Sequence, residues 1–309
     1  FTSKEFMNVL QTTENGWAKD EILTQHIMEA MDTSDQEDFV FTVSVQGHGN
    51  YPETQLIENP KIKVEGIEDE ALKNKWEYYV NQVYEMDQFV GDLIKAVEAR
   101  KEPSVVVFYG DHLPTMGLKA EDLKSRYLYN TNYVIWDNVG LQKQDKNIPA
   151  YQLMSEILNR LDIHSGTVFN YHQQRKGTKN YLSDLELLQY DILYGKQYVY
   201  NNHPPIAEGH MVMGIRDVSL SSIVPQLSSG YSLYGENFTK YSRVYVNGEK
   251  QKSSFLNNTR INLSETELQD GDVIQVGQVG SSDTIFRMSD KYIYQNGQLV
   301  KQEGTATDK

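Results

Sequence analysis

The 309-residue sequence contains no cysteine and has few long apolar runs and few basic residues, and each of these features excludes certain classes of protein. Without cysteine, this chain has no disulfide framework and no thiolate ligand or nucleophile. No apolar run approaches the roughly 18 residues that a membrane-spanning helix needs, and no signal peptide is recognisable. Basic residues are outnumbered, with 29 Lys and Arg against 43 Asp and Glu and a formal net charge of −14. Because a phosphate backbone needs a cationic surface, this balance argues against a nucleic-acid partner.

The chain is long enough, and at 39% hydrophobic residues apolar enough, for two domains. Apolar runs alternate with long helical patterns up to about residue 205, and short β-type runs with Asn-Gly, Asp-Gly and Ser-Gly turns follow. We therefore expect an α/β domain at residues 1–205 and an all-β sandwich at residues 206–309, with a frayed polar tail. Because the first residue is Phe1 and not Met, we expect the chain to begin partway through a longer protein.

The first 161 residues predict a β-α-β arrangement. Residues 38–52 (DFVFTVSVQGHGNYP) predict a strand followed by a Gly-His-Gly turn. Three-and-four spacing of apolar residues predicts a helix at 71–100, and VVVFY at 105–109 predicts a buried strand. This order is typical of parallel strands joined by a right-handed crossover. An apolar run at 133–136 and a helical pattern at 151–161 extend it.

Three polar side chains follow these predicted strands. His48 comes after the first strand, and Asp111 and His112 come directly after the second. Because the carboxyl ends of consecutive parallel strands meet at one edge, we expect the three side chains to face one crevice. Aspartate and histidine together form a donor set suited to a divalent metal such as Mn²⁺ or Zn²⁺. For Gly-Asp-His taken alone, a turn or a helix cap remains the alternative.

Four segments together carry a family resemblance: TVSVQGHGNYP (42–52), FYGDHLP (108–114), NYVIWDN (132–138) and LLQYDILYGKQY (187–198). In this combination and order the sequence resembles the lipoteichoic acid synthase family, within the sulfatase and alkaline phosphatase superfamily. The resemblance implies the later part of an α/β/α layered sheet of the alkaline phosphatase and sulfatase type. It also implies an extracytoplasmic enzyme of the bacterial cell envelope that moves phosphoglycerol from phosphatidylglycerol onto a growing polymer, using a threonine nucleophile and Mn²⁺. Zn²⁺, Mg²⁺ and Ca²⁺ remain alternatives.

The resemblance also implies roles for individual residues. Asp111 and His112 match the family's late metal-ligand pair, and His48 matches the histidine that contacts the phosphoglycerol group. The family's nucleophilic threonine and early acidic ligand lie well upstream, so we expect them before Phe1, together with the part that contacts the membrane. None of the N-terminal threonines follows a strand and opens a helix, and we nominate none of them (Thr2, Thr12, Thr13 and Thr24).

Other polar residues receive structural interpretations. NGWAKDE at 15–21 resembles a Trp-Gly-x-x-Asp stretch of the family with Gly and Trp inverted. We assign it no catalytic role and expect a helix start with Trp17 packed in the core. The remaining histidines are expected at the surface or in linker-like sequence (His26, His164, His172, His203 and His210).

In the second domain, GENFTKYSRVYVNG at 235–248 resembles the IPT/TIG immunoglobulin-like family, whose members often serve as spacers or adhesion modules. Two classes of function therefore remain open. The first is part of a metal-dependent phosphoglycerol transferase, or of a related phosphatase or sulfatase, acting on phosphatidylglycerol or another anionic phospho- or sulfo-ester. The second is a non-catalytic cell-envelope or glycan-binding protein on the same fold.

Overall fold

The computed structural model describes residues 1–9, 11–201, 212–227 and 229–302. The predicted domain boundary between residues 205 and 206 lies outside these described ranges, as do His203 and His210. Within them, no helix combines the length and the apolar character needed to cross a membrane.

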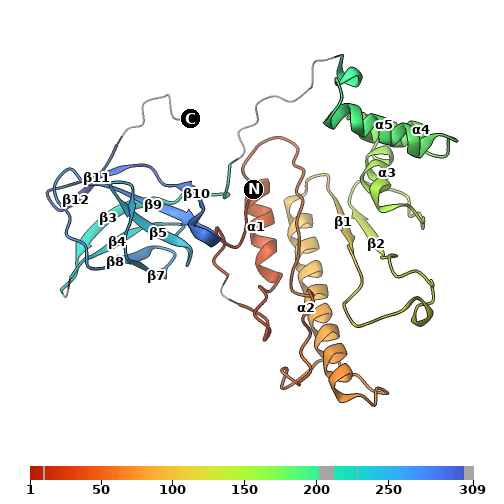
Figure 1. Ribbon diagram of the computed structural model, residues 1–309, viewed down its shortest axis with the longest axis horizontal. Helices are drawn as coiled ribbons and strands as arrows, with labels where there is room; N and C mark the ends of the chain where they lie inside the picture. Colours follow the sequence, from red (N-terminus) through yellow and green to blue (C-terminus); the bar gives the residue numbers. More distant parts are fainter. Residues whose placement is uncertain (10, 202–211, 228, 303–309) are drawn as a thin grey trace. The chain divides into compact units, whose positions relative to one another are not determined.

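The chain divides into two compact units (Figure 1). The first unit comprises residues 1–102, 109–133 and 211–309, and the second comprises residues 103–108 and 134–210.

Two helices of the first unit pack against each other, α1 (Glu21–Met31) and α2 (Glu70–Arg100). The Asp69 side chain caps α2 by accepting hydrogen bonds from the backbone N–H groups of Ala71 and Leu72. At the other end, Lys101 adopts the left-handed conformation typical of a helix C-terminus. One face of α2 is buried, mainly through residues at four- and seven-residue spacing (Tyr78, Gln82, Phe89, Leu93 and Val97). The predicted helix at 71–100 is therefore confirmed.

The prediction of a strand that begins at Asp38 is wrong, because this segment does not pair into a sheet within the described ranges. Residues 38–45 form no ladder with any described segment. Their apolar side chains stand in solvent, with Phe39 74% and Phe41 66% exposed. A strand is stabilised by backbone hydrogen bonds to a neighbour, and no neighbour is present among the described residues. The predicted parallel β-α-β unit is accordingly not formed there, although its helix and second strand are.

The second predicted strand forms as β1 (Val105–Tyr109) and pairs with β2 (Tyr133–Asp137), but its predicted burial is wrong, because four of its residues are half-buried and Tyr109 is exposed. Gly110 donates a backbone hydrogen bond to Asn132, and Asn138 donates one to Ser104. Residue numbers therefore rise along one strand as they fall along the other, which makes the pair antiparallel. A short 3₁₀ turn, η1 (Ala120–Asp122), lies in the connection between them.

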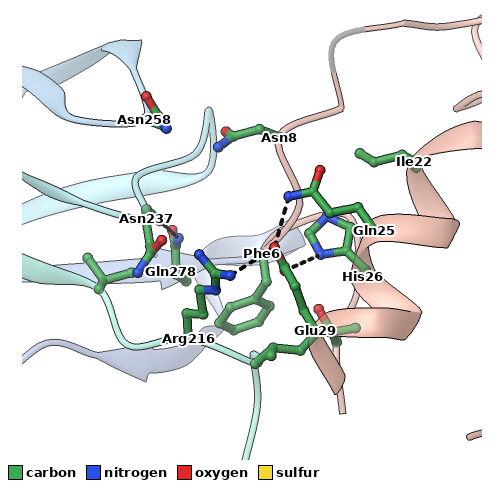
Figure 2. Close-up of a pocket in the computed structure, with 13 residues that line it drawn as sticks. Phe6, Asn8, Ile22, Gln25, His26, Glu29, Arg216, Asn237, Asn258 and Gln278 are labelled. Atoms are coloured by element: carbon green, nitrogen blue, oxygen red, sulfur yellow. Dashed lines mark hydrogen bonds and ion pairs between the residues drawn. The ribbon is translucent and has the colours of Figure 1, made fainter. Parts of the chain in front are cut away.

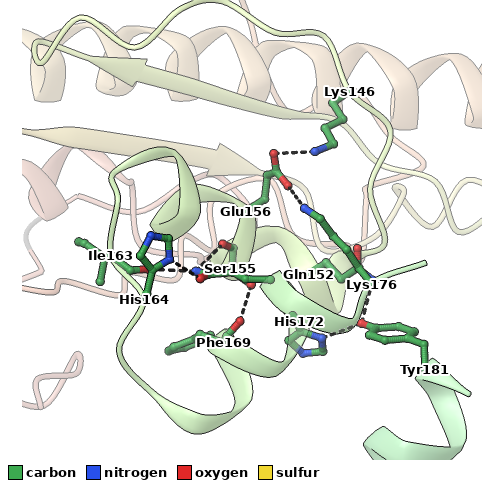
Figure 3. A network of polar contacts seen from close by, with 11 residues as sticks. Lys146, Gln152, Ser155, Glu156, Ile163, His164, Phe169, His172, Lys176 and Tyr181 are labelled. Carbon is green, nitrogen blue, oxygen red and sulfur yellow. Dashed lines mark hydrogen bonds and ion pairs between the residues drawn. The ribbon is translucent and has the colours of Figure 1, made fainter. Parts of the chain in front are cut away.

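Helices make up most of the second unit: η2 (Ala150–Gln152), α3 (Leu153–Arg160), α4 (Thr167–Arg175), α5 (Tyr181–Leu193) and η3 (Tyr198–Tyr200). The helical pattern predicted at 151–161 corresponds to η2 and α3. Figure 3 shows the polar contacts that join these helices. His172 of α4, expected in a linker, is buried, and its Nδ1 lies 2.6 Å from the Tyr181 hydroxyl. Burial lowers the pKa of His172, which favours a neutral ring inside the unit.

The C-terminal part of the first unit is all-β, as predicted. One antiparallel sheet has the strand order β3-β4-β8-β7, formed by Ser219–Pro225, Tyr231–Glu236, Arg260–Leu263 and Ser253–Asn257. The other has the order β12-β11-β9-β5-β6, formed by Gln298–Lys301, Tyr292–Gln295, Val273–Val279, Ser242–Val246 and Glu249–Lys250. β10 (Ile285–Met288) pairs with β9, and a short turn, η4 (Ser281–Asp283), precedes it.

The two sheets share one hydrophobic core. Its members include fully buried side chains from both sheets and from the loop after β4 (Leu233, Phe238, Val244, Ile261, Leu263, Ile274 and Val276). Alternate strand residues point to opposite faces of a sheet, so one face of each sheet supplies this core. The assignment of this region to the immunoglobulin-like family stays a prediction.

Candidate functional site

The three residues predicted to converge lie together in the first unit. The imidazole rings of His48 and His112 are 6.2 Å apart between centroids and nearly perpendicular. Asp111 adjoins His112, and its Oδ1 accepts a 2.8 Å hydrogen bond from the His112 backbone N–H. All three residues are exposed. The structure therefore brings the three residues together without the parallel strands from which this was argued, and their roles stay predictions.

Asp111 and His112 place two possible metal-donor atoms close together. Nδ1 of His112 lies 2.9 Å from the carbonyl oxygen of Leu113. Because a carbonyl only accepts, Nδ1 carries a proton, and in the neutral ring Nε2 therefore has the lone pair. Nε2 in turn lies 3.6 Å from Oδ2 of Asp111. Two donors at that separation can bind one divalent ion at the usual bond lengths of about 2.0–2.2 Å.

The described residues supply only part of a metal site. Among them, no group of three or more His, Asp or Glu side chains is arranged to hold one metal ion. Asp111 and His112 fit a divalent cation as a two-donor fragment. Any further ligands would come from water or from groups outside this set.

Trp17 lies against His48, with ring centroids 5.0 Å apart and planes inclined by 60°. Its backbone is fixed by Thr13, whose N–H donates to the Trp17 carbonyl at 2.7 Å and whose Oγ1 accepts from the Trp17 N–H at 3.1 Å. The side chain is half-buried, so the predicted role as a core anchor is wrong. Trp17 instead lies beside the imidazole, a contact with the candidate site that the sequence interpretation missed.

Asp20 fixes the backbone that leads to His48. Its carboxylate is buried, with 1% of the residue exposed, and Oδ1 accepts hydrogen bonds from the N–H groups of Val45 and Gln46 at 3.2 and 3.3 Å. Oδ2 is buried without a hydrogen-bond partner in the described part of the chain. Burial raises the pKa of Asp20, although the hydrogen bonds it accepts oppose the shift. Asp20 acts on the site through the loop and is a positioning residue.

The Gln46 side chain ties the same loop to α2. Its amide nitrogen donates to Gln82 at 3.0 Å and to Glu85, and its oxygen accepts from the Asp20 N–H at 2.8 Å. Tyr51 holds the loop from its other side, because its hydroxyl donates to the Gly47 carbonyl at 2.9 Å. Burial raises the pKa of Tyr51 to about 12, so the hydroxyl keeps its proton at neutral pH.

The Gly-His-Gly turn packs closely against the segment after His112. A Cβ at Gly49 would lie 2.6 Å from Oγ1 of Thr115, and a Cβ at Gly47 would lie 2.9 Å from Sδ of Met86. Both contacts are too short for alanine without a shift of the neighbour. The glycines therefore let the His48 loop approach α2 and the Asp111-His112 segment.

Comparison with known proteins places this geometry in a wider context. A family model described as Sulfatase matches residues 3–163, just over half of the chain. A protein of Rhizobium meliloti (strain 1021), named "Putative cyclic beta-1,2-glucan modification protein", is 28% identical over 242 residues. The match covers 64% of this chain and 37% of that relative, so the chain spans much less than two thirds of its length. No solved structure matches the chain significantly.

Proposed function

Because this chain belongs to the sulfatase family, we propose that it is part of a metal-dependent phosphoglycerol transferase whose acceptor is a carbohydrate polymer. Family membership supports an enzyme of the sulfatase and phosphatase superfamily, whose members are metal-dependent in general. The resemblance of the His48 and Asp111-His112 segments to lipoteichoic acid synthases supports phosphoglycerol as the transferred group. The relative named for glucan modification supports a carbohydrate acceptor.

The observation that carries the proposal is the approach of the His48 and His112 rings to 6.2 Å, with Asp111 beside them. Transfer of a phosphate or sulfate ester concentrates negative charge on non-bridging oxygens. In a chain of net charge −14, such a substrate needs a local positive group or a hydrogen-bond donor. His48, exposed beside Trp17, can donate a hydrogen bond to an ester oxygen.

Asp111 and His112 would hold the divalent cation through Oδ2 and Nε2. When bound there, the cation supplies charge stabilisation at the ester oxygens. We propose Mn²⁺, with Zn²⁺, Mg²⁺ and Ca²⁺ as alternatives for this oxygen and nitrogen donor pair. The donor substrate is proposed to be phosphatidylglycerol or another anionic ester, and the site of action an extracytoplasmic bacterial envelope.

Paramagnetic Mn²⁺ tests the metal part of this proposal by NMR of the histidine imidazoles. We expect the His48 and His112 signals to broaden first, and Asp111→Ala to abolish the selectivity. The chain contains a matched comparison pair, His164 and Asp162, whose Nε2 and Oδ1 lie 2.9 Å apart in the second unit. Equal broadening of His164, or broadening of His112 that survives Asp111→Ala, would contradict the metal assignment.

Glycerol 1-phosphate tests the substrate part. With diamagnetic Mg²⁺ in place of Mn²⁺, it should shift the His48 signal more strongly than inorganic sulfate does, and His48→Ala should weaken its binding. Stronger perturbation by sulfate would favour a sulfatase. Absence of any effect at His48 would favour the non-catalytic alternative. Release of glycerol phosphate from phosphatidylglycerol vesicles, measured with the purified chain, reports turnover directly.

A further inference from the structure

A cavity of polar character lies in the first unit and shares no residue with the His48 site. Its volume is about 290 Å³, and it opens between the N-terminal segment, one face of α1 and the all-β region (Figure 2). The walls mix amide, charged and apolar side chains. The volume lies near the lower end of the range of about 300–1,000 Å³ for small-molecule sites, which is enough for about one or two sugar residues.

Charges within the cavity compensate each other. Glu29 of α1 is only 13% exposed at its side chain, and Oε1 accepts from Nη2 of Arg216 at 3.1 Å and from the Gln25 amide at 2.8 Å. Its Oε2 lies 3.1 Å from Nδ1 of His26. His26, expected at the surface, is thus a partly buried wall residue. With the carboxylate and the guanidinium paired, the cavity carries no formal charge when His26 is neutral, which disfavours a phosphate or carboxylate ligand.

Side-chain amides in the cavity wall supply hydrogen-bond donors and acceptors that a ligand can use. The side chains of Asn8 and Asn258 line the cavity and make no hydrogen bond within the described part of the chain. Asn237, beside them, donates to the Asp217 carbonyl at 2.7 Å and is thereby held in place. Each free amide offers two donors and an acceptor, the combination that hydroxyl groups require.

The N-terminal wall of the cavity is fixed before any ligand arrives. The α-amino group of Phe1 donates to Val212 at 2.9 Å, and Thr239 donates a buried 2.7 Å hydrogen bond to the Glu5 carbonyl. Phe6 packs so closely on Gly214 that a Cβ there would lie 2.5 Å from its ring. A preformed wall of this kind reduces the entropy lost on binding.

We propose that this cavity binds an uncharged stretch of a carbohydrate chain. Amides with free donors and acceptors, together with a compensated ion pair, match sugar hydroxyls better than they match an ionic group. The apolar side chains of Phe6, Ile22 and Val218 provide surface for the C–H faces of a sugar ring. The inference goes beyond the transfer reaction because it requires neither a metal nor His48. The cavity would hold polymer whether or not this chain takes part in catalysis.

The test is titration of the whole chain with a β-1,2-linked glucose tetrasaccharide, followed by NMR of the side-chain amides. Maltotetraose serves as a second neutral probe and glycerol 1-phosphate as an anionic one. We expect at least one neutral probe to bind saturably and to shift the amide signals of Asn8 and Asn258. Asn8→Ala and Asn258→Ala should each weaken that binding by about three- to tenfold, the value of one net hydrogen bond.

Gln298→Ala is the matched control, because Gln298 is an exposed amide on β12 of the same all-β region and does not line the cavity. It should leave the affinity unchanged. Failure of both neutral probes to bind at millimolar concentration would overturn the proposal, as would equal weakening by Gln298→Ala or a preference for glycerol 1-phosphate at these amides. The outcome is independent of the His48 experiments, since those observe a different set of signals.

Discussion

Asp20 and Gln46 hold each other through two reciprocal hydrogen bonds. The N–H of Asp20 donates to the Gln46 side-chain oxygen at 2.8 Å, and the N–H of Gln46 donates to Oδ1 of Asp20 at 3.3 Å. This pair joins the start of α1 to the loop that carries His48 two residues later. The position of His48 therefore depends on a buried acid 28 residues earlier in the sequence.

Replacing Asp20 by alanine should loosen the His48 loop. The substitution removes the acceptor of the Val45 and Gln46 N–H groups, which at this depth should cost about 1–3 kcal/mol of unfolding free energy. Urea unfolding gives the stability change, and amide hydrogen exchange at Val45 and Gln46 shows whether it is local. Asp35→Ala, which removes an exposed carboxylate, is the control and should change neither. Unaltered exchange in Asp20→Ala would rule out the positioning role.

The same carboxyl should leave a signature in the pH dependence of stability. Burial raises the pKa of Asp20 above its ordinary value of 3.8, so the folded state favours the protonated form. The stabilisation from this group is therefore complete below pH 3.8 and is lost as the pH rises through the elevated value. Relative to Asp20→Asn, which does not titrate, the wild type should lose unfolding free energy over that interval. A difference that stays constant with pH, or that grows in favour of the wild type, would contradict the assignment.

Local pattern was sufficient to predict much of this fold. The periodicity that predicted a helix at 71–100 persists because α2 buries a continuous face and has its own caps. The turn-rich β-type sequence after residue 212 likewise predicts its sheets, because most of the strand pairs there join strands that are consecutive in the chain. Residues 38–45 behave differently, because a strand exists only when a second strand pairs with it.

The site was predictable only in part for a related reason. His48, Asp111 and His112 could be nominated because each follows an apolar run, and the structure brings them together. Trp17 and Asp20 could not be nominated in this way. Their contacts with the His48 loop join segments about 30 residues apart, and these segments share no periodicity. An aspartate between an exposed turn and a helix is indistinguishable in sequence from an ordinary cap, yet the Asp20 side chain makes no capping bond to α1.

Steric contact between Gly49 and Thr115 gives a prediction about the His48 turn. Gly49→Ala would place a Cβ 2.6 Å from the threonine Oγ1, so we expect a loss of about 1–2 kcal/mol and a shifted His48 imidazole signal. Thr115→Ala in the same chain removes that oxygen and leaves the next Thr115 atom, its Cβ, 3.9 Å away, which should restore the signal. The control is Gly91→Ala within α2, where no atom lies within 4 Å of the new Cβ and helix propensity predicts a gain. If the double variant behaves like Gly49→Ala alone, the contact is not the cause.

Glu156 holds two lysines of the second unit, and its removal should destabilise that unit alone. Its carboxylate accepts from Lys146 at 2.6 Å and from Lys176 at 2.9 Å (Figure 3). Burial opposes its ionisation, but the two ammonium groups outweigh burial and lower the pKa of Glu156 below its ordinary value of 4.5. This stabilisation is therefore present above pH 4.5 and is lost as the pH falls through the lowered value.

Glu156→Gln should accordingly cost about 1.5–3 kcal/mol at neutral pH, the range of hydrogen bonds to a charged group, and progressively less in acid. Amide hydrogen exchange along α3 and α4 measures the effect where it should occur, while exchange in α2 should not change. Glu186→Gln on the exposed face of α5 is the matched control, with the same loss of charge and no expected loss of protection. Equal effects of the two substitutions would mean that net charge, and not the lysine contacts, governs the stability of this unit.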